Sequence, residues 1–246
     1  MTPIQALLCT IYAFCTSYFQ QWADVLVFYA PVVTGTVVGA IMGDVTTGLL
    51  VGGTLELAFV GLVWVGAALP PDATVGTIAA TVLVIETGVD PLAALGVAWT
   101  VAVLVTHSNV FFAMVGISYA MPIADRYAAE GNTSGLTLLH LLSGAGWGLG
   151  RAVPTAIFTF LGLPVVTSFI EYVPAIVWNA IKAGGIVLGA VGIAGLLNTL
   201  WRPRLWPMYA LGFAFAAFLG VPFVGLAIIA LALSAALVYG AKRRTK

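Results

Sequence analysis

The stretch Val51-Gly-Gly-Thr-Leu-Glu-Leu-Ala-Phe-Val-Gly61 places a carboxylate, Glu56, in one of the most apolar parts of the chain. An ionised side chain in hydrocarbon is costly, so an acid in such a position usually faces a cavity, a partner or a substrate. The preceding glycines, Gly52 and Gly53, predict an interruption of a membrane helix. Interrupted helices are one way in which membrane proteins build a polar site near the bilayer midplane.

The composition of the whole chain supports a membrane location. Of 246 residues, 61% are hydrophobic and 7% are charged, and the mean hydropathy is +1.10, whereas soluble domains carry roughly 25% charged residues. We predict an all-α polytopic membrane protein with about seven to ten hydrophobic segments, including glycine-broken helices and re-entrant hairpins. For a chain of this length and composition we expect no separate soluble catalytic domain.

The charged residues are distributed unevenly. The first 125 residues contain seven acids and no Lys or Arg. Because short cytoplasmic loops are enriched in basic residues, the tail Lys242-Arg243-Arg244-Thr-Lys246 predicts a cytoplasmic C-terminus. A net charge of zero argues against nucleic acid as a partner.

The longest polar interval lies halfway along the chain. We expect a single integral membrane domain over residues 1–246, in which apolar halves of about 1–121 and 136–240 are joined by a polar loop, 122–135. Two halves of similar length are compatible with an inverted repeat.

Glu56 has two interpretations. As a functional group, its carboxylate would accept hydrogen bonds from a sugar or bind an ion, and the neighbouring Gly53 and Thr54 are further candidates for substrate binding. As a structural group, it would bond a helix terminus or a backbone amide. Phe59 and Trp64 follow on the same half of a resumed helix and would offer an aromatic face to a sugar ring, although Trp64 is equally suited to interfacial anchoring.

Two further acids precede apolar segments. Asp72 stands before the short segment Ala73–Ile85, which is better suited to a re-entrant piece than to a full crossing. It is a good N-cap, and a helix N-terminus inside a hairpin also creates a polar pocket, so Asp72 is a second candidate site residue. Asp44 occupies another cap or turn position, where capping is the more favoured role and ligand contact the alternative.

Little in the sequence indicates catalysis. Known hydrolase, zinc-protease and nucleotide-binding motifs are absent, and His107 and His140 have no carboxylate at helical spacing. We predict neither a cofactor nor a metal site, nor a catalytic residue. Arg151 is a lone base in an apolar segment and therefore needs a buried partner or a route to the interface; an ion pair with one of the early acids fits, without the sequence showing which.

Several spaced elements cover nearly the whole chain: Pro31-Val-Val-Thr-Gly-Thr-Val-Val-Gly39, Gly43-Asp44-Val-Thr-Thr-Gly48, Gly52-Gly-Thr-Leu-Glu56, Gly66-Ala-Ala, Pro71-Asp72, Ala124-Asp125, Glu130-Gly131-Asn132, His140, Arg151 with Pro154, and Leu211-Gly212-Phe213. Together they resemble the IIC membrane subunit of the mannose/fructose/sorbose family of the bacterial phosphotransferase system.

The resemblance implies a sugar permease subunit in the bacterial plasma membrane. Such a subunit pairs with a IID membrane subunit, forms a higher oligomer of IIC–IID pairs, binds a hexose and delivers it to a cytoplasmic IIB protein for phosphorylation. The phosphoryl group travels through IIA and IIB, so this chain would have no catalytic site of its own. The family also implies an elevator-type movement. Mannose-type members carry polar residues where this chain has Val27, Tyr29 and Ala30, which leaves mannose, fructose, sorbose and amino sugars open.

Two other functions remain compatible with the residues. An autonomous ion-coupled secondary transporter would use Glu56 as a proton or sodium site. A non-transporting scaffold, or a docking protein for a bacteriocin or phage, would bind its partner without needing Glu56.

Overall fold

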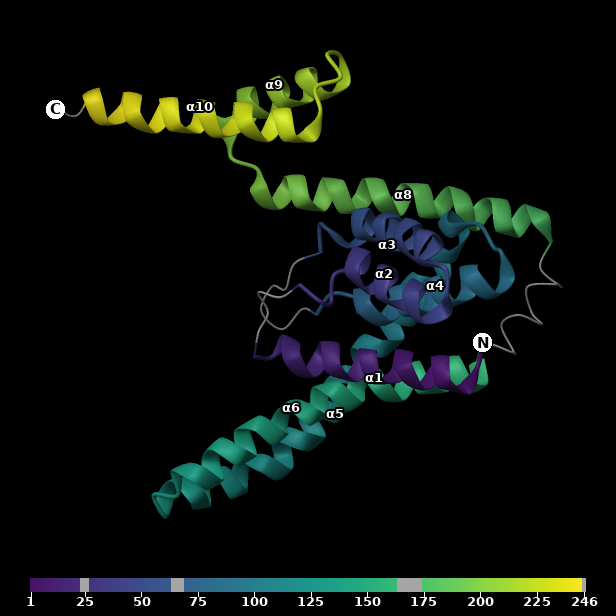
Figure 1. Ribbon diagram of the computed structural model, residues 1–246. Helices are drawn as coiled ribbons and strands as arrows, with labels where there is room; N and C mark the ends of the chain where they lie inside the picture. Colours follow the sequence, from purple (N-terminus) through teal and green to yellow (C-terminus); the bar gives the residue numbers. More distant parts are fainter. Residues whose placement is uncertain (23–26, 63–68, 163–173, 245–246) are drawn as a thin grey trace. The chain divides into compact units, whose positions relative to one another are not determined.

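The computed structural model describes residues 1–22, 27–62, 69–162 and 174–244, and within these ranges the regular structure is entirely helical. The nine α-helices of the described residues agree with the predicted all-α fold (Figure 1). The elements are α1 (Pro3–Gln20), α2 (Pro31–Met42), α3 (Val45–Phe59), α4 (Ala73–Thr87), α5 (Pro91–Ala129), α6 (Thr133–Ala156), a π-helical turn η2 (Ile157–Gly162), α8 (Ala175–Leu200), η3 (Pro203–Leu205), α9 (Trp206–Ala217) and α10 (Phe223–Arg244).

The chain forms two compact units, residues 1–196 and 197–246. The first holds α1 to α6 and most of α8. In the second, α9 contacts α10, and the connection between them contains Gly220 with a φ of 60°. The candidate site lies wholly in the first unit.

Helices α2 and α3 form a tight hairpin in which glycines replace side chains at the contact. Gly35 and Gly39 of α2 face Gly48 and Gly52 of α3, and a Cβ atom on any of the four would meet backbone atoms of the other helix. Helices in a membrane pack closely through such small residues. The hairpin turns at Gly43, whose φ of 91° favours glycine.

The predicted interruption at Gly52-Gly53 is wrong, because α3 runs unbroken from Val45 to Phe59. Gly52 serves close packing instead: its Cβ would lie 2.5 Å from the carbonyl oxygen of Pro31 and 3.0 Å from the Cα of Val32. Gly53 is different, since a Cβ there meets nothing within 4 Å. The two adjacent glycines therefore form a matched pair for an experiment.

Replacing Gly52 by Ala is expected to force α2 and α3 apart, at a cost of about 1–3 kcal/mol, as for other overpacked contacts. Gly53→Ala is expected to be neutral or to stabilise the helix by up to about 1 kcal/mol, because Ala is the better helix former. Thermal unfolding of the purified variants compares them. Equal losses of stability at the two positions would contradict the assigned packing.

Helix α4 lies at the centre of the first unit. Every residue from Thr74 to Val84 is buried, and the helix contacts α2, α3 and α5 (Figure 1). It begins at Ala73 as the sequence predicts. With 15 residues it is shorter than the roughly 20 that an upright crossing needs, so its predicted re-entrant placement remains a prediction.

Helices α5 and α6 form a long hairpin that replaces most of the predicted polar loop. The interval 122–135 is helical except for residues 130–132, where Gly131 has a φ of 67°. Asn132 caps α6, because its side chain accepts a hydrogen bond from the backbone N–H of Gly135 at 2.9 Å. Polar composition indicated a loop here, but it marks the polar ends of two helices. Within the described residues, α5 is the one helix with the length and hydropathy of a membrane crossing.

Candidate functional site

A cavity of about 270 Å³ opens where the ends of several helices meet in the first unit. Its wall is formed by the C-terminal ends of α1 and α3, the segments that lead into α2 and α4, and the facing sides of α5 and α6. The polar lining includes Gln20, Tyr29, Glu56, Asp72, Asn109 and Arg151.

Glu56 connects the cavity to the start of α2. Its Oε2 accepts a hydrogen bond from the backbone N–H of Val32 at 3.1 Å, while the N-cap position of that helix, Ala30, has no side-chain cap. A carboxylate at a helix N-terminus satisfies an otherwise unpaired donor and interacts favourably with the helix dipole. Within the described residues this is its single hydrogen bond, and Oε1 has no partner there. The structural interpretation is confirmed, and the functional one is compatible with it.

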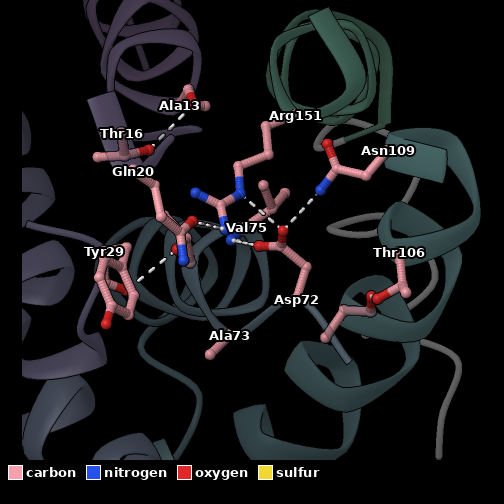
Figure 2. A network of polar contacts seen from close by, with 12 residues as sticks. Ala13, Thr16, Gln20, Tyr29, Asp72, Ala73, Val75, Thr106, Asn109 and Arg151 are labelled. Carbon is pink, nitrogen blue, oxygen red and sulfur yellow. Dashed lines mark hydrogen bonds and ion pairs between the residues drawn. The ribbon is translucent and has the colours of Figure 1, made fainter. Parts of the chain in front are cut away.

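Asp72 is the centre of a buried polar network (Figure 2). Its Oδ1 caps α4 by accepting from the N–H of Val75 at 3.0 Å, which confirms the predicted N-cap. Its Oδ2 accepts from Arg151 Nε at 2.6 Å and from Asn109 Nδ2 at 2.8 Å. Arg151 Nη2 donates to Gln20 Oε1 at 2.9 Å. One carboxylate thereby joins α4 to α5 and α6, and through the guanidinium to α1.

The burial of this network makes its pairing essential. Asp72, Asn109 and Arg151 are 7%, 6% and 5% exposed. Removing one member of a buried ion pair leaves an uncompensated charge, which is far more costly than losing an exposed pair. Of the two possibilities predicted for Arg151, a buried partner or a route to the interface, the structure shows a buried partner, and it is Asp72.

The start of α4 is also held by backbone contacts. The N–H of Asp72 donates to the carbonyl of Ala102 at 3.0 Å, and the Thr106 hydroxyl donates to the carbonyl of Pro70 at 3.2 Å. On the other side, the Thr74 hydroxyl donates to the carbonyl of Tyr29 at 3.0 Å. These bonds fix the cavity wall to α5 and to the segment before α2.

The other predicted site residues lie elsewhere. The Thr54 hydroxyl donates a hydrogen bond to the carbonyl oxygen of Leu50 in its own helix. Asp44 caps α3 by accepting a hydrogen bond from the N–H of Thr47 at 3.0 Å. Neither residue lines the cavity, nor does Gly53. Trp64 lies outside the described residues. The cavity therefore brings together Glu56 and Asp72 of the predicted set.

Aromatic side chains contribute to the wall in a different way from that predicted. Phe59 lines the cavity, but its ring stacks on Trp99 with centroids 5.2 Å apart. Trp147 of α6 also lines it. Trp147, Gln20 and Asn109 are not among the site residues predicted from the sequence. For the two amides the available signal was a polar side chain in or beside an apolar segment.

An apolar chain, helical throughout its described secondary structure, has a cavity lined in part by polar side chains, with the Asp72–Arg151 pair buried in the wall. These features have the character of a membrane transport component rather than an enzyme. A family model described as the sorbose-specific IIC component of the phosphotransferase system matches residues 3–236. The chain therefore belongs to this IIC family of bacterial membrane permease components, whose members are transport subunits.

Individual relatives agree with that assignment. The chain is 30% identical over 206 residues to the fructose permease IIC component of Bacillus subtilis, covering 84% of this chain and 76% of the relative. It is 30% identical over 231 residues to the mannose-specific EIIC component of Escherichia coli K12, covering 93% and 86%.

Two solved structures resemble the fold. One, described only as a membrane protein, has a TM-score of 0.88 and 28% identity, and the match covers 97% of this chain and 96% of the other. The other is the mannose transporter ManYZ in complex with microcin E492, with a TM-score of 0.61, 28% identity and the same coverage.

Proposed function

We propose that this chain is the sugar-translocating permease subunit of a phosphotransferase system and that its cavity binds a hexose or an amino sugar. The observation that carries the proposal is the meeting of Glu56, Asp72, Asn109 and Arg151 in one cavity wall beside Trp147. Sugar hydroxyls both donate and accept hydrogen bonds, and a sugar ring also has an apolar face that packs on an aromatic side chain. A volume of about 270 Å³ lies just below the range of drug-sized pockets and suits a small ligand.

The chemistry of phosphorylation is assigned to other subunits. Neither His107 nor His140 lines the cavity: Nδ1 of His107 contacts the carbonyl oxygen of Val103 in its own helix, and the ring of His140 packs edge-on against Trp22. We propose that the chain pairs with a IID membrane subunit in a higher oligomer and presents the sugar to a IIB protein, which IIA supplies with phosphate. A IIC component is, by its name, one part of such a system.

The proposed transport movement is of the elevator type, in a multi-pass protein of the plasma membrane with a cytoplasmic C-terminus. The short, buried α4 and the tight α2–α3 hairpin support it, because they form a compact body next to the longer α5–α6 hairpin. The basic tail at residues 242–246 supports the orientation.

Uptake experiments that omit one subunit at a time test this function. Cells that express the chain with its cognate IID, IIB and IIA proteins are expected to accumulate phosphorylated sugar from a labelled panel of mannose, fructose, sorbose and N-acetylgalactosamine. Omission of IIB or IID is expected to reduce accumulation to the background of cells that lack the chain. Accumulation of unmodified sugar by the chain alone, abolished by collapse of the ion gradient, would instead establish the ion-coupled alternative.

A further inference from the structure

One nitrogen of the Arg151 guanidinium has no hydrogen-bond partner in the part of the chain that the structure describes. Nε is bonded to Asp72 and Nη2 to Gln20, whereas Nη1 is buried without a hydrogen-bond acceptor among the described residues. The side chain is 6% exposed and lines the cavity. Figure 2 shows the guanidinium between the side chains of Gln20 and Asp72. A buried charged donor without an acceptor is unfavourable, so a ligand oxygen that bonds it is bound more tightly.

A second unpaired atom in the network is sterically blocked. Asn109 Oδ1 also has no partner among the residues that the structure describes, but it lies against Gly150, where an added Cβ would collide with it. Helix α6 therefore covers this oxygen closely. Nη1 of Arg151 is buried as well, but it is an unpaired donor on a side chain that lines the cavity, and Glu56 Oε1 is an acceptor without a partner among the described residues.

We propose that Arg151 Nη1 donates a hydrogen bond to an oxygen of the sugar, and that this contact and Glu56 together fix the orientation of the ring. The proposal rests on the proposed function. It adds a specificity rule: the position next to Arg151 requires an oxygen with a free lone pair, and an ammonium group is excluded there by like charge. Next to Glu56, by contrast, the sugar can carry a hydrogen-bond donor such as an amine.

The variant Arg151→Lys tests the contact. Lysine retains the positive charge opposite Asp72, but its single nitrogen does not also supply the separate donor at the Nη1 position. Equilibrium binding to the purified complex with its IID subunit is measured for mannose, fructose, sorbose and N-acetylgalactosamine, and then for the monodeoxy analogues of each sugar that binds. Arg126→Lys is the control, because Arg126 is exposed and bonded to Glu130.

For the parent sugar, Arg151→Lys is expected to weaken binding about tenfold to a hundredfold, as for loss of a charge-assisted hydrogen bond. For one monodeoxy analogue, wild type and variant are expected to bind equally weakly, because the oxygen that Arg151 contacts is already missing. Equal losses for the parent and every analogue would show a purely structural role and overturn the proposal, as would wild-type affinity throughout.

A map of the wild-type complex tests the same contact if Arg151→Lys does not accumulate. Cryo-electron microscopy with the bound sugar is expected to show a sugar oxygen within about 3.2 Å of Nη1. A water molecule alone, or no atom, at that position would overturn the proposal. If the wild-type complex binds none of the four sugars, the proposed function itself is contradicted and the inference falls with it.

Discussion

Asp72→Asn and Arg151→Gln, made singly, are each expected to lower the free energy of unfolding by roughly 3–5 kcal/mol, because each leaves the other charge buried and unpaired. Asn at position 72 retains a side-chain oxygen that can cap α4, so the loss is assigned to the charge and not to the cap. Made together, the two substitutions remove both charges. The double variant is therefore expected to recover most of the stability that either single variant loses.

Thermal unfolding of the purified single and double variants, followed by intrinsic fluorescence, gives the required comparison. The control is Glu130→Gln, which breaks the exposed Arg126–Glu130 pair and is expected to cost less than about 1 kcal/mol. If the losses at positions 72 and 151 simply add in the double variant, the two residues do not act as a pair.

Features that depend on neighbouring residues, or on the composition of the whole chain, could be predicted from the sequence. The start of α4 at Ala73 follows from Asp72, whose side chain bonds an N–H three residues away. The all-helical fold follows from the apolar composition, because a backbone in lipid must satisfy its own hydrogen bonds. In the first case the cause and its effect lie close together in the chain, and in the second the cause is spread over all of it.

The error at Gly52-Gly53 has a physical origin. The lack of a side chain allows a glycine either to interrupt a helix or to let another backbone approach, and the sequence of one helix does not distinguish the two. The distinguishing signal lay in the preceding helix, where Gly35 and Gly39 have the same spacing as Gly48 and Gly52. Paired glycine spacings on consecutive helices indicate close packing better than a glycine pair alone indicates a break.

The partner of Arg151 could not be predicted, for a related reason. Asp72 lies 79 residues earlier in the chain, and seven acids precede the first basic residue. Which of them meets Arg151 depends on how α4 and α6 are brought together by the rest of the fold. The polar interval 122–135 was predicted as a loop because charged residues are frequent in loops, although they are equally suited to exposed helix ends.

Glu56→Gln is the second change with a large expected effect, and it separates the two roles of this side chain. Glutamine retains an oxygen that can accept from the N–H of Val32, so the cap on α2 and the stability of the hairpin are expected to persist. It loses the charged acceptor toward the cavity. Sugar affinity is expected to fall about tenfold or more, as for loss of a hydrogen bond to a charged group.

Asp44→Asn provides the matched control, because it makes the same acid-to-amide change at a helix cap that does not line the cavity. Its expected sugar affinity is that of the wild type. Both variants are compared at equal levels of folded, membrane-inserted protein, so that a loss of affinity is not confused with a loss of protein.

The measurement that tests the cavity as the sugar site most directly is equilibrium binding of a labelled sugar. It is made separately for wild type, Glu56→Gln and Asp44→Asn, each purified as a complex with the proposed IID subunit. We predict that Glu56→Gln loses affinity while unfolding at the wild-type temperature, and that Asp44→Asn binds as the wild type does. Wild-type affinity in a folded Glu56→Gln complex would contradict the assignment of the sugar to this cavity wall.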